Sequence, residues 1–200
     1  MIKAVYFDFG NVLATVDRDE ICAAIGIHSP LTTREIEVRI FGTDIEWDSE
    51  TGRIDSHGHF NRIKSSIDGE PSWTYEQFAA EFPTGLHLNE EGISAMKFAG
   101  REKRVFILSN TSYVHSLWLY SQEPLATLPE GFVFSFKVGV MKPDPEIWLK
   151  ALSMHSLDAQ ECIYIDDIPE FCSAAEDLGF SAIHYAKGQT DLRAELQNRF

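Results

Sequence analysis

Cysteine is scarce in this chain. Among 200 residues there are three, Cys22, Cys162 and Cys172, and no two of them form a CxxC pair. This number and spacing exclude a disulfide-rich secreted scaffold and a cysteine-ligated zinc site. We therefore expect three reduced thiols and a reducing compartment.

Positive charge is also scarce. Lysine and arginine together number 17 against 31 aspartates and glutamates, which gives a formal net charge of -14. Binding to a nucleic-acid backbone requires a basic surface, so we expect no nucleic-acid partner. A small phosphorylated molecule is not excluded, because its site needs only a few local positive groups.

Long apolar runs are missing. No run approaches the roughly 20 residues of a membrane-spanning helix, and the N-terminus does not show the basic-then-apolar order of a signal peptide. We expect no membrane partner, a cytoplasmic location, and a monomer or weak homodimer. The length suits one or two domains.

Five short apolar runs predict buried strands. The first ends at Asp8, and the others span 104–108, 132–136, 162–165 and 181–185. Helical patterns separate them, with Asn89 and Asp144 as expected N-caps and Gly179 as an expected C-terminal glycine. This alternation predicts an α/β fold with a doubly wound, mainly parallel, Rossmann-like sheet.

Residues 16–87 break the alternation. Helical spacing occurs in 32–42, 55–67 and 74–82, and no stretch reads as a convincing strand. We predict that 16–87 is a small helical domain inserted after the first strand. The α/β core would then comprise 1–15 and 88–200.

Polar side chains follow four of the predicted strands. They are Asp8, then Ser109 and Asn110, then Lys142, and finally Asp166 with Asp167. In open α/β sheets the carboxyl ends of the strands form the ligand site, so we expect these groups to meet at one edge. Neighbouring carboxylates repel one another unless a cation such as Mg²⁺ lies between them. Ser109 and Lys142 would then donate to an anion, most simply a phosphate.

The ordered set resembles the haloacid dehalogenase superfamily, or HAD-like hydrolases, over the whole chain. The matching stretches are "FDFGNVL" (7–13), "ILSNTS" (107–112), "GVMKPDPEIW" (139–148) and "IYIDD" (163–167). The inserted helices look like the small helical cap of that family. "SNTSYVHSLW" and "TGRID" are similar to a subgroup that includes sugar-phosphate phosphatases and the phosphatase domain of soluble epoxide hydrolases.

The resemblance implies roles for the residues that bind and attack the substrate. Asp8 matches the nucleophile that forms a covalent aspartyl-phosphate. Ser109 and the amides from Asn110 onward match the groups that hold the phosphoryl oxygens. Lys142 matches the lysine that neutralises the charge of nucleophile and phosphate.

The resemblance also implies a magnesium site. Its ligands would be Asp8, the backbone carbonyl of Gly10, and Asp167, with Asp166 acting directly or through water.

Gly10 departs from the family pattern, because the phosphatases of this family usually carry an aspartate two residues after the nucleophile. Glycine keeps the carbonyl and loses the acid, whose help is typically worth roughly 10²–10⁴-fold in rate. Another group replaces it, turnover is slow, or the leaving group needs little help. Asp17 is a candidate substitute, and a solvated hinge residue is the competing interpretation. Ile168 and Phe171 make the surroundings of the metal site more apolar than usual.

Three functions remain open at this point. The first is a Mg²⁺-dependent phosphatase of a small phosphorylated metabolite such as a sugar phosphate. The second is a haloacid dehalogenase, in which Asp8 attacks carbon without a metal. The third is a catalytically weak or silent binding protein that uses the same pocket. The two acids Asp166 and Asp167 favour the phosphatase.

Overall fold

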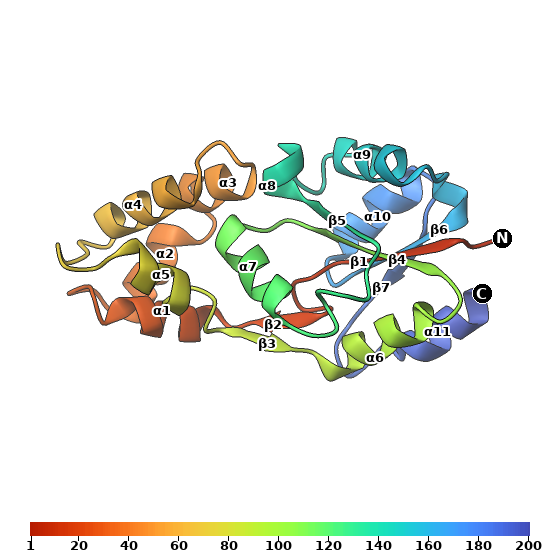
Figure 1. The fold of residues 1–200 in the computed structure, drawn as a ribbon, viewed down its shortest axis with the longest axis horizontal. Coiled ribbons are helices and arrows are strands. Elements are labelled where there is room, and N and C mark those ends of the chain that lie inside the picture. The colour runs from red at the N-terminus through yellow and green to blue at the C-terminus, as the bar shows by residue number, and fades with distance from the viewer.

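Five parallel strands form one sheet at the centre of the computed structural model, which describes residues 1–200 (Figure 1). The strand order is β5-β4-β1-β6-β7, and all four pairings are parallel. The strands are β1 (Ala4–Phe7), β4 (Arg104–Ser109), β5 (Gly131–Phe134), β6 (Cys162–Asp166) and β7 (Ser181–His184). The predicted parallel α/β sheet is therefore confirmed.

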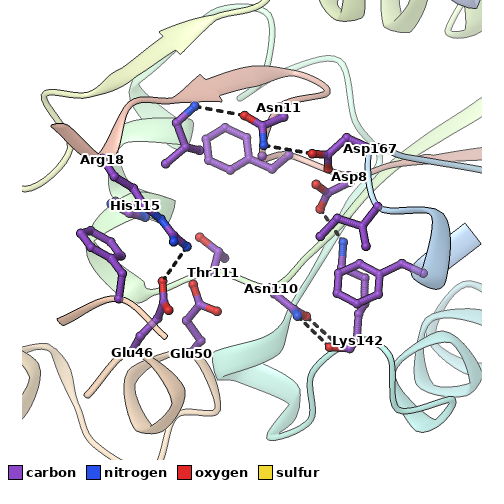
Figure 2. A pocket seen from close by; sticks show the side chains of 16 residues that line it. Asp8, Asn11, Arg18, Glu46, Glu50, Asn110, Thr111, His115, Lys142 and Asp167 are labelled. Atoms are coloured by element: carbon purple, nitrogen blue, oxygen red, sulfur yellow. Dashed lines mark hydrogen bonds and ion pairs between the residues drawn. The ribbon is translucent and has the colours of Figure 1, made fainter. Parts of the chain in front are cut away.

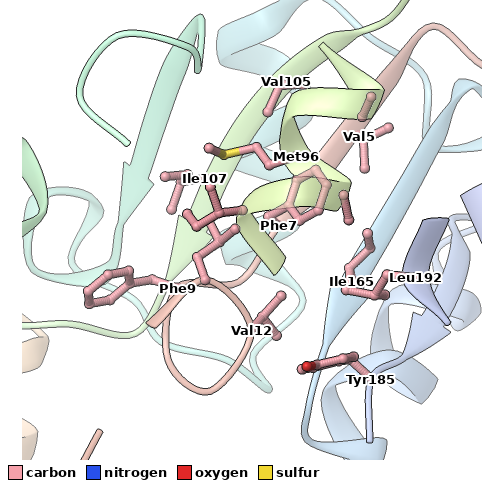
Figure 3. Close-up of a cluster of buried hydrophobic side chains, with 14 of the residues drawn as sticks. Val5, Phe7, Phe9, Val12, Met96, Val105, Ile107, Ile165, Tyr185 and Leu192 are labelled. Carbon is pink, nitrogen blue, oxygen red and sulfur yellow. The ribbon is translucent and has the colours of Figure 1, made fainter. Parts of the chain in front are cut away.

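Helices cover both faces of the sheet, and β1 shows why. Val5 and Phe7 point into a cluster with residues of α6 (Glu90–Ala99) and α11 (Leu192–Arg199) (Figure 3). Ala4 and Tyr6 point the opposite way, toward residues of α9 (Glu146–His155) and α10 (Pro169–Asp177). A strand buried on both faces is apolar throughout, and β1 therefore appears in the sequence as a continuous apolar run.

A second, helical unit follows β1, and we call it the cap. Its helices are α1 (Arg18–Gly26), α2 (Thr33–Ile40), α3 (Asp44–Glu50), α4 (Ser56–Ser66) and α5 (Tyr75–Glu81). They enclose a core of their own, in which Trp73 and Phe78 are buried. Val114, on α7 (Tyr113–Ser121), joins this core from the sheet side.

Two strands lie where the sequence indicated none. β2 (Ala14–Val16) and β3 (Leu86–Leu88) pair antiparallel and connect the cap to the rest of the molecule. The expectation of no strand in 16–87 was wrong at both ends, because three residues are too few to show a period-two pattern. Strands β2 and β3 each extend across one of the two expected domain boundaries. The division into 1–15, 16–87 and 88–200 therefore stays a prediction.

The third predicted strand is shorter than expected. It ends at Phe134, and Ser135 begins α8 (Ser135–Val138). The hydroxyl of Ser135 accepts the Thr111 N–H at 2.9 Å and donates to the Thr111 carbonyl at 3.3 Å. Those bonds tie the end of β5 to the loop after β4, where candidate site residues lie.

Two predicted helix starts differ in detail. Asn89 occupies the N-cap position, but its side-chain amide donates to Val12 O at 2.8 Å and to Tyr185 Oη at 3.0 Å. Asp144 lies two residues before the first residue of α9, and its Oδ1 accepts the Glu146 N–H at 2.9 Å. None of the helices is both long enough and apolar enough to cross a membrane.

Candidate active site

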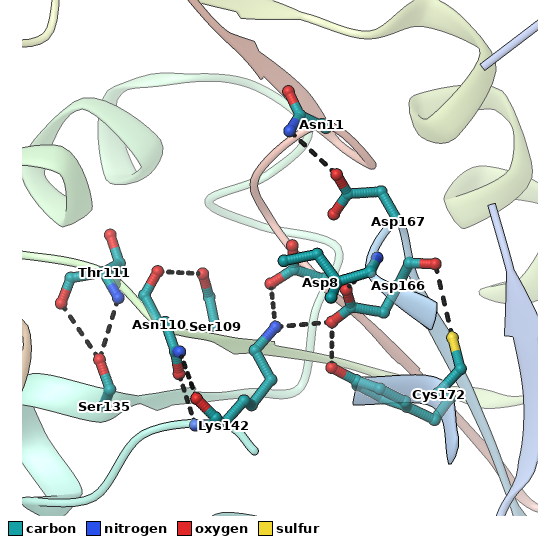
Figure 4. A network of polar contacts seen from close by, with 12 residues as sticks. Asp8, Asn11, Ser109, Asn110, Thr111, Ser135, Lys142, Asp166, Asp167 and Cys172 are labelled. Atoms are coloured by element: carbon teal, nitrogen blue, oxygen red, sulfur yellow. Dashed lines mark hydrogen bonds and ion pairs between the residues drawn. The ribbon is translucent and has the colours of Figure 1, made fainter. Parts of the chain in front are cut away.

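A lysine joins two aspartates at the carboxyl edge of the sheet (Figure 4). Lys142 Nζ lies 2.6 Å from Asp8 Oδ1 and 2.7 Å from Asp166 Oδ2. The three residues are 3%, 6% and 0% exposed respectively. The loop between α8 and α9 and the ends of β1 and β6 thus converge on one buried ion-pair network.

Burial and charge act against each other in this network. Burial raises the pKa of the Asp8 carboxyl, and the ammonium of Lys142 opposes the rise. Burial also lowers the pKa of Lys142, but Asp166 and Asp8 outweigh it and raise that pKa above its usual value. Lys142 is therefore a fixed cation beside Asp8.

Both carboxylate oxygens of Asp166 accept hydrogen bonds from protein donors. Its Oδ2 accepts from Lys142 and from the hydroxyl of Tyr164, and its Oδ1 accepts the Ile168 N–H at 2.9 Å. Tyr164 was not identified from the sequence. Lys142 Nζ also lies 5.0 Å from the ring centroid of Phe171, close enough for a cation–π interaction.

Asp167 is more open than Asp166. Its Oδ2 accepts from the side-chain amide of Asn11 at 3.0 Å. Desolvation raises the pKa of Asp167, and the Asn11 hydrogen bond opposes the rise. One ligand oxygen each from Asp8, Asp166 and Asp167 lie within 4.8 Å of one another. Three clustered carboxylates form a donor set that suits a hard divalent cation.

The backbone directly after Asp8 forms a tight turn. The Gly10 carbonyl accepts the Val12 N–H at 2.7 Å, and a carbonyl oxygen has a second lone pair. Asn11 has a φ of 55°, in the left-handed region that asparagine tolerates better than most residues. Sequence reasoning missed Asn11, although an asparagine directly after a glycine at a strand end is a signal for such a turn.

Ser109 and Asn110 lie beside Lys142. The Ser109 hydroxyl donates to Asn110 O at 3.0 Å. The Asn110 side chain donates to Lys142 O at 3.0 Å and accepts the Lys142 N–H at 2.8 Å, so it holds the lysine loop. The backbone N–H groups of Phe9 and Asn110 donate to no protein atom, which leaves both free for an anion.

These groups open into a cavity of about 320 Å³ between sheet and cap, which we call the active-site cavity (Figure 2). The sheet side carries Asp8, Lys142 and Asp167. The cap contributes four residues that no sequence pattern marked, namely Arg18, Phe41, Glu46 and Glu50. The α7 helix contributes His115, which belongs to the "SNTSYVHSLW" stretch.

Arg18 and Glu46 form a pair on the cap side. Arg18 Nη2 donates to Glu46 Oε1 at 3.4 Å, and its guanidinium lies 4.7 Å from the ring centroid of Phe41. Glu46 Oε2 accepts the Gly42 N–H at 2.6 Å. Both oxygens of Glu46 are thus engaged.

Asp17, the candidate substitute acid, does not line the active-site cavity. It lines a separate hollow beside the paired strands β2 and β3. Its carboxylate is the N-cap of α1 and accepts the Glu20 N–H at 3.0 Å. Asp17 therefore stabilises the first helix of the cap. This position favours the interpretation as a hinge residue over the interpretation as a substitute acid.

Comparisons with known proteins agree with this geometry. A family model described as haloacid dehalogenase-like hydrolase matches residues 2–179. D-ribitol-5-phosphate phosphatase of Bacteroides thetaiotaomicron is 25% identical over 205 residues, covering 98% of this chain and 97% of that protein.

Solved structures with a similar fold include the following two enzymes. A HAD family enzyme of Bacteroides thetaiotaomicron, in complex with magnesium and inorganic phosphate, superposes with a TM-score of 0.82 at 22% identity, covering 95% and 97% of the two chains. L-2-haloacid dehalogenase of Xanthobacter autotrophicus superposes with a TM-score of 0.70 at 18% identity, covering 100% of this chain and 84% of that one. Because the family model spans most of the sequence, the chain belongs to the haloacid dehalogenase-like hydrolases.

Proposed function

We propose that the protein is a phosphatase of a small phosphorylated metabolite, such as a sugar or polyol phosphate, that works with Mg²⁺ and a covalent intermediate on Asp8. The observation that carries this proposal is the charge of the site. Asp8, Asp166 and Asp167 cluster around one cation, Lys142, which leaves two negative charges in excess when all are ionised. Unpaired buried carboxylates are costly, and one divalent cation balances them.

Asp8 is placed to act as the nucleophile. Its Oδ1 accepts from Lys142, while its Oδ2 accepts no hydrogen bond from the protein. An Asp8 oxygen attacks phosphorus, the P–O bond to the ester oxygen breaks, and the alcohol leaves. Water then attacks the phosphorus of the aspartyl-phosphate, which releases inorganic phosphate and restores the carboxylate.

The surrounding groups stabilise charge on the phosphoryl group. Lys142 lowers the repulsion between the carboxylate and the phosphate, and its position is fixed by Asp166 and Asn110. The Ser109 hydroxyl and the free N–H groups of Phe9 and Asn110 would hold phosphoryl oxygens.

Magnesium would be held by Asp8, Asp167 and the Gly10 carbonyl. When bound, it supplies positive charge beside the transferring phosphoryl group. Asn11 would orient Asp167 through its 3.0 Å hydrogen bond. In this arrangement Asp166 serves Lys142, with any contact to the ion made through water.

The leaving group would occupy the cap side of the cavity. A volume of about 320 Å³ suits a small ligand, and Arg18, Glu46 and Glu50 make that side polar. The similarity to a D-ribitol-5-phosphate phosphatase supports a polyol or sugar phosphate.

The test is a panel of small phosphate esters, assayed for phosphate release with Mg²⁺ and with a chelator. We expect Mg²⁺-dependent release by the wild type and none by Asp8→Asn, which keeps the size of the side chain but removes the nucleophile. A parallel assay measures halide release from 2-chloropropionate. Halide without phosphate would make the protein a dehalogenase, and neither product would make it a binding protein.

A further inference from the structure

The active site lacks an acid where one is needed. Gly10 offers no proton for the leaving ester oxygen, yet nothing in the structure requires glycine there. Its φ is not positive, and an added Cβ would lie 3.7 Å from both Asp8 Oδ2 and Val16 Cγ2, an ordinary contact distance. The backbone would therefore admit a carboxyl group at position 10, and its absence there directs attention to acids on the other walls of the cavity.

Most titratable side chains of the cavity are already engaged. Lys142 holds Asp8, Asn11 holds Asp167, and Glu46 is bound by Arg18 and by a backbone N–H. His115 stacks on Phe82, with ring centroids 4.9 Å apart, and burial lowers its pKa to about 4. A histidine held neutral in this way has no proton to give at neutral pH.

Glu50 is the exception. It is the last residue of α3, lines the active-site cavity and is partly buried. No protein group donates a hydrogen bond to its carboxyl group or forms an ion pair with it. Figure 2 shows this carboxyl group pointing from the cap into the cavity, with Asp8 and Lys142 on the far side.

The charges that face Glu50 favour its protonated form. Burial, Glu46 and Asp8 raise its pKa, Lys142 and Arg18 oppose them, and the result is a pKa of about 8. His115 also lines this side of the cavity and is neutral. At neutral pH Glu50 is thus a carboxylic acid without a partner, directed into the active-site cavity.

We propose that Glu50 is the general acid and base of this enzyme, delivered by the cap in place of a carboxyl group at position 10. This rests on the proposed phosphatase function. In the first step Glu50 gives its proton to the ester oxygen as the P–O bond breaks, and the alcohol leaves. In the second step the Glu50 carboxylate takes a proton from water as the water oxygen attacks phosphorus, which restores both Glu50 and Asp8.

The location of Glu50 couples the chemistry to the cap. The nucleophile is on the sheet and the acid is on α3, so both steps require the cap to lie over the sheet edge. A phosphoryl group that enters while the cap is displaced meets Asp8 without a proton donor. Substrate fit beneath the cap would thereby control turnover as well as binding.

The experiment compares wild type with Glu50→Gln on two esters under single-turnover and burst conditions. The first is 4-nitrophenyl phosphate, whose leaving group departs without a proton. The second is D-ribitol 5-phosphate, or whichever alkyl phosphate of the panel the wild type hydrolyses fastest. With the aryl ester we expect a burst of about one nitrophenolate per site and then slow turnover, because only the second step needs the base. With the alkyl ester the first step itself should slow by roughly 10²–10⁴-fold, without a burst.

Two further variants make the result decisive. Asp44→Asn removes an exposed carboxylate at the start of the same helix, outside the active-site cavity, and we expect it to keep the wild-type ratio between the two esters. Gly10→Asp in the Glu50→Gln background places an acid next to Asp8 and should recover much of the alkyl-ester rate. Thermal melting confirms that each variant is folded.

The outcomes separate this proposal from the phosphatase proposal. If the wild type releases no phosphate from any ester, the phosphatase proposal fails and this one fails with it. If the wild type is active but Glu50→Gln loses the same factor on both esters, shows no burst and is not rescued by Gly10→Asp, Glu50 is not the acid.

Discussion

Lys142 Nζ lies 2.6 Å from Asp8 Oδ1, and both side chains are almost fully withdrawn from water. The two residues are 134 positions apart, with Asp8 directly after β1 and Lys142 in the loop between α8 and α9. Asp166 holds the same ammonium from the other side at 2.7 Å. The cation beside the proposed nucleophile is thus in position in the free protein, and a charge that is already in position stabilises a transition state without reorganisation.

Removing this lysine should destabilise the protein. Lys142→Met leaves Asp8 and Asp166 buried without their cation, and breaking such a pair typically costs about 3–5 kcal/mol. Urea unfolding measures the change. Lys150→Met is the matched control, because Lys150 forms an exposed pair with Glu146 at 3.0 Å, and such pairs contribute little. Equal losses in the two variants would show that the buried network does not stabilise the fold.

Mg²⁺ should bind at the carboxylate cluster. Calorimetric titration of the wild type is expected to show one site, and Asp167→Ala should weaken it by about tenfold or more, since it removes a ligand. Asp177→Ala, an exposed acid in α10, provides the control and should bind like the wild type. If Asp167→Ala binds Mg²⁺ with the affinity of the wild type, Asp167 is not a ligand and the ion binds at another site.

The stability of the protein should depend on pH through Glu50. Its pKa is about 8 in the folded chain against 4.5 as the ordinary value. A raised pKa means that folding takes up a proton, so the stabilising effect is complete below pH 4.5 and is lost as pH rises through 8. Glutamine cannot ionise, so its contribution does not change with pH. The melting temperature of Glu50→Gln should therefore rise relative to that of the wild type as the pH increases from 4.5 to 8. A constant difference between pH 5 and pH 9 would mean that Glu50 is ionised throughout.

The ribbon between sheet and cap should tolerate no side chain at Gly85. An added Cβ there would lie 2.1 Å from Asp17 O, so Gly85→Ala must push the two strand ends apart. We expect a loss of about 1–3 kcal/mol, typical of overpacking. Gly10→Ala is the comparison, because its Cβ would meet only ordinary contacts and should change stability by less than about 1 kcal/mol. Chemical denaturation of both variants provides the measurement, and similar values would contradict the close approach at Gly85.

The sequence was informative where strands end. Asp8, Ser109, Lys142, Asp166 and Asp167 each follow an apolar run, and parallel strands bring their carboxyl ends together. The sheet makes this inference possible because its topology fixes the edge at which the residues meet.

The cap residues of the site could not be predicted in the same way. Glu50 belongs to a seven-residue helix with little periodic pattern, and a glutamate at a helix end usually faces solvent. Its direction depends on how α3 packs beside α8, a contact between elements about 90 residues apart in the chain. Asn11 and Tyr164 were missed for a related reason, since their roles are set by side-chain partners and not by their own hydrophobic pattern.

The most direct test of the mechanism is to look for the covalent intermediate on Asp8. Wild type turning over an aryl phosphate with Mg²⁺ is quenched in acid, digested, and examined by mass spectrometry. We predict one phosphoryl group on the peptide that contains Asp8, accumulating further in Glu50→Gln and absent from Asp8→Asn. Release of phosphate at the full rate by Asp8→Asn, or an unmodified Asp8 peptide in Glu50→Gln after a complete burst, would contradict it.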